Sequence, residues 1–128
     1  MSYGNLGNVY DSQGQFQRAL ENHQKALEIF IKVSGQDNRV ATSFINIGAV
    51  YAEKGDFENA LVHMQKGLEI KTRVFGSDHL DVAKSYNNIS NVDNRQVKYE
   101  EALEYYQKHL DITVRLVGRR PPERGHII

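Results

Sequence analysis

The sequence contains no cysteine, and its two prolines, Pro121 and Pro122, are adjacent near the C-terminus. The absence of cysteine excludes a disulfide framework, a thiolate metal site and a cysteine nucleophile. No apolar run approaches the roughly 20 residues that a membrane-spanning helix needs. No charged stretch followed by an apolar one opens the chain as a secretion signal would. We therefore expect a cytoplasmic protein that does not act in a membrane.

An excess of charge of either sign is also missing. Sixteen Lys and Arg residues balance sixteen Asp and Glu residues, so the formal net charge is zero. This balance argues against a general electrostatic attraction to nucleic acid or to an anionic membrane. The 128 residues have the size of a single domain that can bury a core without metal or disulfide support.

The chain repeats itself. The segment Asn5-Leu6-Gly7-Asn8-Val9-Tyr10 recurs as Asn-Ile-Gly-Ala-Val-Tyr at residues 46–51 and, in altered form, as Asn-Ile-Ser-Asn-Val-Asp at residues 88–93. The offset is 41 residues between the first two copies and 42 between the second and third. Each unit is too short to bury its own apolar surface, so stacked units are expected to share one continuous core.

Each unit divides into two helical segments. In the second unit, Phe44, Ile47, Gly48 and Tyr51 follow the helical spacing of three and four residues, which predicts a helix from about residue 40 to 54. Gly55-Asp56 interrupts this pattern, with Asp56 as the expected N-cap of a second helix over 57–75.

Gly76 is expected to end that second helix, and Asp78 or Asp81 to cap the next one. Strand-type alternation is absent from the sequence. The pattern therefore predicts an all-α fold, an α-solenoid of about three stacked helix-turn-helix repeats.

These positions resemble the tetratricopeptide repeat. The family pattern of an aromatic residue, Leu-Gly, Tyr, Ala, a large residue and a second Ala is matched in the first unit by Tyr3, Leu6-Gly7, Tyr10, Ala19, His23 and Ala26. The closing proline of the family is missing, because Ile31, Thr72 and Val114 stand there, and the period is about 42 instead of 34 residues. The long second segment followed by Gly76-Ser77-Asp78-His79 resembles the kinesin light chain subtype. The family resemblance implies that the solenoid is wound as a right-handed superhelix.

The third unit departs most from the pattern. Ser90 replaces the glycine, Asp93 replaces the tyrosine, and Val97 stands where the second unit has Gly55. A carboxylate in a packing position costs free energy unless it reaches water. We expect this unit to be the least stable and to fray first.

We divide the chain into repeat units at about 1–38, 39–79 and 80–118, followed by a tail over 119–128. The prolines and charges of the tail predict disorder. One codon choice for a fourth repeat's start, Gly-Glu-Asp-His-Pro-Asn-Val-Ala-Thr-Ser-Tyr, encodes this tail when it is read two nucleotides later. We interpret the tail as such a frame-shifted reading, the alternatives being a chance basic tail or a genuine terminus.

Signals for catalysis are missing. The five histidines do not show a metal-ligand spacing such as HExxH, and neither a P-loop nor a GxGxxG phosphate-binding motif occurs. His23 and His63 are expected to be packing or surface residues, and His79 a structural residue of a loop. We expect a protein that is not an enzyme and that needs no cofactor or metal.

Asparagine recurs in the first helix of each unit, although it is a mediocre helix former. The family resemblance implies that this helix lines a concave groove, where side-chain amides can both donate to and accept from the backbone of an extended peptide. A clamp for a C-terminal carboxylate is disfavoured, because Gly4 and Asn88 stand where the family's clamp has cations. Lys84 and Arg95 remain available for acidic residues of an internal peptide motif. The candidate peptide-binding residues are Asn5, Asn8, Asn46, Lys84, Asn88, Asn91 and Arg95.

Three functions remain open. The first is an adaptor that binds extended peptide segments of other proteins, in a kinesin light chain-like version as a cargo adaptor. The second is the regulatory repeat region of an enzyme whose catalytic domain lies outside these residues. The third is a structural array that associates end to end through its exposed end faces.

Overall fold

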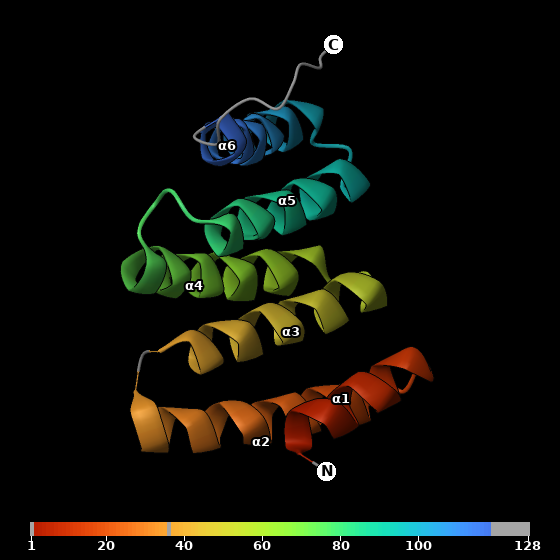
Figure 1. The fold of residues 1–128 in the computed structure, drawn as a ribbon. Coiled ribbons are helices and arrows are strands. Elements are labelled where there is room, and N and C mark those ends of the chain that lie inside the picture. Colours follow the sequence, from red (N-terminus) through yellow and green to blue (C-terminus); the bar gives the residue numbers. More distant parts are fainter. Residues whose placement is uncertain (1, 36, 119–128) are drawn as a thin grey trace.

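The computed structural model describes residues 2–35 and 37–118, so the tail over 119–128 and the expectations for it lie outside the described residues. Six helices account for most of the described chain and no strand occurs in it. They are α1 (Tyr3–Ser12), α2 (Phe16–Ser34), α3 (Asn38–Lys54), α4 (Phe57–Phe75), α5 (Leu80–Arg95) and α6 (Tyr99–Gly118). The helices are stacked along one direction, with α1 and α2 at one end and α6 at the other (Figure 1).

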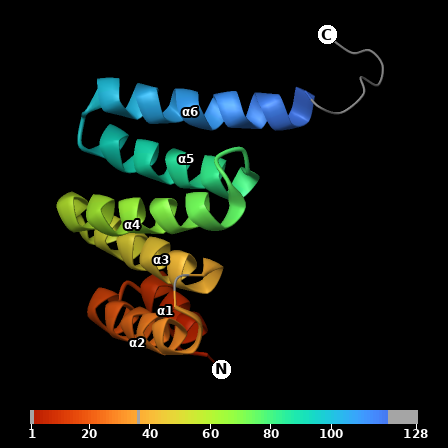
Figure 2. The same ribbon diagram turned by 90° about the vertical axis from the view of Figure 1, so that its left-hand side faces the viewer.

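The stack is built from three hairpins, α1–α2, α3–α4 and α5–α6. Successive hairpins touch through α2 against α3 and through α4 against α5. Figure 2 shows the same order from the side, with the α3–α4 hairpin between the other two. Such nearest-neighbour packing defines a solenoid. The prediction of an all-α solenoid of three stacked hairpins is therefore confirmed.

The turns inside the hairpins follow the sequence signals. Asp56 caps α4 by accepting a hydrogen bond from the Asn59 N–H at 3.3 Å, as expected. Gly14 and Gly55 occupy the first two turns with positive φ angles of 75° and 87°. Val97 occupies the third with a φ of 64°, a conformation that a β-branched residue rarely adopts. The third hairpin therefore carries backbone strain in its turn.

The cap of α5 was predicted wrongly. Neither Asp78 nor Asp81 caps this helix, because the N-cap is His79, whose Nδ1 accepts the Asp81 N–H at 3.0 Å. The His79 ring stacks on Phe75 with 4.2 Å between the ring centroids. The Asp78 carboxylate instead pairs with the Arg115 guanidinium of α6 at 2.6 Å. The Gly76-Ser77-Asp78-His79 segment thus fixes the loop between the second and third hairpins.

Small residues let the two helices of a hairpin approach closely. A Cβ on Gly48 would lie 2.8 Å from Cγ of Met64 and 2.9 Å from the carbonyl oxygen of Ala60. In the first hairpin, a Cβ on Gly7 would lie 2.7 Å from Nε2 of His23, which occupies the position of Met64. Such distances leave no room for a side chain without movement of the backbone or ring.

In the third hairpin, the close contact between the two helices is formed by different residues. Ser90 stands at the glycine position and donates a hydrogen bond from its hydroxyl to the Ala102 carbonyl at 2.8 Å. Asp93, which replaces the repeated tyrosine, is only 4% exposed. Burial raises the pKa of Asp93, an effect that Lys98 opposes and Glu101 reinforces. The Asp93 carboxylate is therefore held at a free-energy cost that Tyr10 and Tyr51 do not carry.

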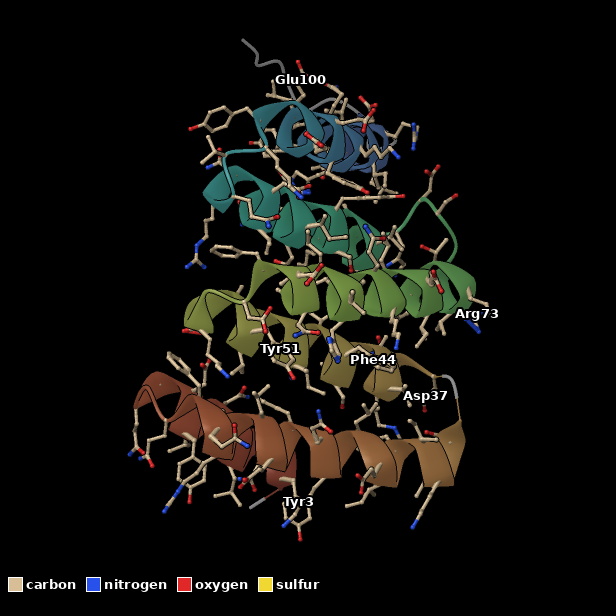
Figure 3. The ribbon with its side chains drawn as sticks, turned by 180° about the vertical axis from the view of Figure 1, so that it is seen from behind. Tyr3, Asp37, Phe44, Tyr51, Arg73 and Glu100 are labelled. Carbon is tan, nitrogen blue, oxygen red and sulfur yellow. The ribbon has the colours of Figure 1, made fainter. Side chains whose placement is uncertain are left out.

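A lysine lies over an aromatic ring at the same repeat position in all three hairpins. The Nζ atoms of Lys25, Lys66 and Lys108 lie 5.5, 5.6 and 5.5 Å from the ring centroids of Tyr3, Phe44 and Tyr86. Figure 3 labels Tyr3 and Phe44 in successive layers of the stack. Each contact joins the two helices of one hairpin, and contacts of this geometry are attractive.

Candidate functional site

Three of the candidate asparagines meet in one groove. Asn5 and Asn8 reach it from α1, and Asn46 reaches it from α3. The groove has a volume of about 310 Å³. We call it the amide groove, and its lining is Gly4, Asn5, Asn8, His23, Ala26, Phe30, Asn38, Arg39, Thr42, Ser43 and Asn46.

The α3 wall of the amide groove is one helical face. Ser43, Thr42, Arg39 and Asn38 precede Asn46 by three, four, seven and eight residues, which is the spacing of side chains that share a face. The sequence reasoning named only Asn46 on this helix. The other four residues of this face could have been identified from the sequence by counting the helical spacing back from Asn46.

The side-chain amides of the three candidate asparagines are unpaired, whereas Asn38 of the same groove accepts a hydrogen bond from Nζ of Lys71 at 2.8 Å. No hydrogen bond joins the side chains of Asn5, Asn8 or Asn46 to another residue within ranges 2–35 and 37–118. Asn5 and Asn8 are exposed and Asn46 is half-buried. Each amide offers two donors and an acceptor, so the groove presents a row of unpaired donors and acceptors over a short distance.

The floor of the groove comes from α2. Ala26 and Phe30 give it an apolar surface, and His23 lies between them and Gly7 with 1% of its surface exposed. Burial lowers the pKa of His23, and the negative charge of Asp11 only partly opposes this. The imidazole is therefore neutral at neutral pH, and the floor carries no charge.

The single cation of the groove is already partnered. The Arg39 guanidinium donates to Oδ2 of Asp37 at 3.2 Å and lies 5.2 Å from the Phe30 ring centroid. Burial of Asp37 is outweighed by hydrogen bonds from Ser34, Val40 and Arg39, which hold the pKa of this carboxyl below its ordinary value. The amide groove is thus polar and close to neutral, and it suits peptide backbone better than a strongly acidic segment.

Two further candidates lie at the corresponding positions one hairpin later. Lys84 and Asn88 on α5 occupy the repeat positions of Thr42 and Asn46 on α3. Lys84 is exposed and Asn88 is half-buried. At the position of the neutral Thr42, the third hairpin carries a lysine.

The structure does not bring Asn91 and Arg95 into the amide groove. Asn91 lines a separate hollow between α5 and α6, together with Asn94, Tyr99 and Leu103. The Arg95 guanidinium lies 5.1 Å from the Phe57 ring centroid at the end of α5. The seven candidates therefore divide into a set of three in the groove, a pair on α5 and two residues elsewhere.

A larger hollow of about 490 Å³ lies between α2 and α3, and the sequence reasoning did not single it out. Its charged residues are Glu21, Lys25, Glu28 and Lys54, so both signs are interspersed along it. The Lys25 and Lys54 side chains lie over the rings of Tyr3 and Tyr51. Both lysines of this hollow are thus engaged with aromatic rings.

Within the described residues, no three His, Asp or Glu side chains are grouped so that they could hold a metal ion. No helix of this part of the chain combines the length and the hydropathy that crossing a bilayer requires.

Comparison with known proteins places the chain in a family. The tetratricopeptide repeat family model matches residues 1–70 and 39–113, which together span most of the chain. Among solved structures, BtubC (BKLC) from P. vanneervenii superimposes with a TM-score of 0.84 at 23% identity, over 98% of this chain and 51% of that one. The apo form of RapI gives a TM-score of 0.74 at 27% identity, over 88% of this chain and 40% of that one.

The search of curated proteins found no match. The chain spans about half the length of BtubC and two-fifths of RapI. These likenesses agree with the repeated Leu-Gly and Ala positions and with the stacked hairpins described above. The chain therefore belongs to the tetratricopeptide repeat family, whose members generally mediate protein interactions without catalysis.

Proposed function

We propose that the chain is a non-enzymatic adaptor module that binds an extended peptide segment of a partner protein in the amide groove. The observation that carries this proposal is the convergence of Asn5, Asn8 and Asn46, from two hairpins, on one hollow with their amides unpaired. An extended peptide offers a backbone N–H and C=O at each residue, and side-chain amides satisfy both. The apolar floor at Ala26 and Phe30 accepts one uncharged side chain of that peptide.

The partner segment continues over α5 in this proposal. Lys84 and Asn88 extend the row from the amide groove, so an acidic residue of the peptide lies opposite Lys84 and not opposite Arg39. The Arg39 guanidinium already forms an ion pair with the Asp37 carboxylate. The acidic character of the ligand is therefore confined to the half that meets the third hairpin.

The kinesin light chain-like version of the proposal assigns this groove to cargo peptides in the cytoplasm. It rests on the period of about 42 residues and the segment from Gly76 to His79. That segment has a structural role in the loop before α5, so it supports the subtype of the repeat more than the cargo function.

The test is peptide selection followed by measured affinity. A random peptide library displayed on phage is selected against the wild-type chain, and the enriched peptides are titrated by fluorescence anisotropy. Asn46→Ala should weaken binding about fivefold, since a lost hydrogen bond costs about 1 kcal/mol. Asn22→Ala is the control, because the Asn22 amide bonds to the Arg18 carbonyl outside the groove.

Lys84→Ala separates the two halves of the site. This substitution should weaken the binding of only those selected peptides that carry an acidic residue. The loss of affinity should be smaller at high salt, because salt screens the charge pair. Selected peptides that bind Asn46→Ala and wild type equally would contradict the groove proposal. Circular dichroism must show equal helicity for all variants, so that a loss of binding reports the site and not the fold.

A further inference from the structure

Lys71 of α4 is a buried lysine that contacts a residue in the wall of the amide groove. Its side chain is 11% exposed, and Nζ lies 3.8 Å from Oδ2 of Asp81 on α5. The same ammonium group lies 5.8 Å from the Phe75 ring centroid. It donates a hydrogen bond to Oδ1 of Asn38, the first residue of α3, at 2.8 Å. These contacts matter because a buried charge without partners is costly.

The contact between Lys71 and Asn38 is particular to the central hairpin. Phe30 and Thr113 stand at the position of Lys71 in α2 and α6, and Leu80 stands at the position of Asn38 in α5. The other hairpins thus pack the same two helices without this pair. The pair is therefore not part of the packing that the repeat requires, and its place beside the amide groove points to a role there.

Lys71 determines which end of the Asn38 amide is available to a ligand. A lysine ammonium donates and cannot accept, so the atom that it contacts must be the amide oxygen. Asn38 lines the amide groove and Lys71 does not, so the bonded oxygen faces away from the groove. The amide nitrogen Nδ2 remains, and it forms no hydrogen bond within residues 2–35 and 37–118.

We propose that Asn38 is a further binding residue of the amide groove, where its Nδ2 donates to a backbone carbonyl oxygen of the bound peptide. The three other asparagines of the proposed site offer donors and an acceptor, whereas Asn38 offers donors alone. The positive charge of Lys71 on the amide oxygen polarises the group and strengthens these donors. Lys71 is a positioning residue, because it acts on the ligand through Asn38. The inference rests on the proposed function and adds which polar group of the peptide lies at the start of α3.

The charges around Asn38 favour a neutral acceptor. The Lys71 ammonium faces Asp81, and the Arg39 guanidinium faces Asp37. Each cation beside Asn38 is thus balanced by a carboxylate, and this part of the wall offers donors without net charge. A backbone carbonyl satisfies such donors, whereas a carboxylate would lose water without gaining an unpaired cation.

Asn38→Asp tests the donors while it keeps the contact with Lys71. Aspartate has the shape of asparagine, keeps an oxygen for the ammonium and turns an acceptor towards the groove. The fold should be retained, because an acidic residue in the first turn of a helix is favourable. Peptides selected on the wild-type chain should bind this variant about tenfold more weakly by fluorescence anisotropy, since two oxygens then face each other.

Asn94→Asp is the matched control. It makes the same change of charge in the separate hollow between α5 and α6, and it should bind the selected peptides like the wild type. Lys71→Met tests the positioning role, because it removes the ammonium and keeps an unbranched side chain. The Asn38 amide can then present either end, so about half of the molecules offer the donors and affinity should fall about twofold. Circular dichroism must show equal helicity for all variants.

NMR of the isotope-labelled chain reports the donors directly. The side-chain NH₂ signal of Asn38 should move downfield when a selected peptide is added, because a proton that donates to oxygen is deshielded. The NH₂ signal of Asn22 should stay in place, since that amide already donates to the Arg18 carbonyl. In Lys71→Met the movement of the Asn38 signal should be smaller.

The outcomes distinguish this inference from the proposed function. Peptides that lose affinity for Asn46→Ala but bind Asn38→Asp like the wild type would overturn the role of Asn38 and leave groove binding intact. An Asn38 signal that does not move in a complex that forms would do the same, as would an equal loss of affinity in Asn94→Asp. A library without any peptide that depends on Asn46 would overturn both.

Discussion

Gly48 of α3 lies directly against the Ala60 carbonyl of α4, so close that a Cβ would lie 2.9 Å from that oxygen. Backbone meets backbone at this point, and neither side can yield by rotating a side chain. Ala60 itself is fully buried in the same contact. This single approach sets the distance between the two helices of the central hairpin, and through it the spacing of the layers on either side.

Gly48→Ala should therefore destabilise the chain by about 1–3 kcal/mol, because overpacking forces backbone shifts. Gly4→Ala is the matched control, since the nearest atom to its added Cβ is Oγ of Ser2 at 4.0 Å. That change should leave stability unchanged or raise it by about 0.5 kcal/mol through reduced unfolded-state entropy. Urea denaturation followed by circular dichroism measures both. Equal midpoints for Gly48→Ala and wild type would show that the helices can separate without cost.

The turn of the third hairpin predicts a stabilising substitution. Val97 adopts a φ of 64°, while Gly14 and Gly55 occupy the equivalent turns. Val97→Gly should raise the free energy of unfolding by about 1 kcal/mol, because the strain of the left-handed conformation exceeds the entropic cost of glycine.

Val114→Gly makes the same chemical change at a helical position of similar exposure in α6. It should lower stability by a few tenths of a kcal/mol to about 1 kcal/mol, since glycine is a poor helix former. Thermal denaturation of both variants gives the comparison. The same sign of effect in both variants would refute the strain at Val97.

The buried His23 predicts sensitivity to acid. Its pKa is lowered from 6.5 by burial, so the unfolded chain binds more protons than the folded one as the pH falls through this range. The contribution of the neutral His23 imidazole to the free energy of unfolding is fully present above the unfolded pKa of 6.5. It is lost as the pH falls towards the lower pKa of the folded chain. His23→Met places at this position the residue type of its equivalent Met64, and it should reduce the loss.

Urea midpoints at about pH 8 and about pH 5 measure this effect. The difference between the two pH values should be smaller in His23→Met than in the wild type. An unchanged difference would mean that His23 binds its proton as readily in the folded chain as in the unfolded one.

The raised pKa of Glu53 predicts a dependence of stability on pH that is opposite to that of His23. Burial raises the pKa of Glu53 from 4.5 to about 6, and the neighbouring Asp11 side chain adds to this while Arg95 opposes it. The folded chain then binds more protons than the unfolded one between these values, so this contribution to stability is present below pH 4.5 and is lost as the pH rises through about 6.

Glu53→Gln and Asp11→Asn should each flatten this loss between pH 4.5 and about 6, because each removes one member of the pair. The double variant should resemble either single one. Additive effects of the two substitutions on the pH profile would show that the carboxyls titrate independently.

The sequence predicted the architecture because its signals repeat. Three features recur in every unit: a Gly or Ser at one position, an Ala at another and a break after the first helix. A chance match in one unit is therefore recognised by comparison with the other two. Asp56 and Gly76 were identified by local chemistry alone, and the structure places them at the ends of α4. The cap of α5 was missed because a histidine and two aspartates compete over four residues, and only the stacking of His79 on Phe75 selects among them.

The candidate site was predictable in part. Repetition of asparagine identified Asn5, Asn8 and Asn46, but the sequence does not show that Arg39 is neutralised by Asp37 or that Arg95 lies against Phe57. The first is a local contact at the start of α3, and the second depends on how α5 packs against α4. Periodicity indicates which face of a helix turns to the core, but not which side chains of the next helix that face meets.

The three helical hairpins follow from the amino-acid sequence alone, because periodicity, turn residues and caps are local properties that recur in each unit. Which side chains meet follows instead from the packed fold, because contacts between hairpins depend on the crossing of α2 with α3 and of α4 with α5. The same leucine position is buried in α2 and exposed in α6 for that reason. Its environment is set by the presence of a following helix and not by the residue itself.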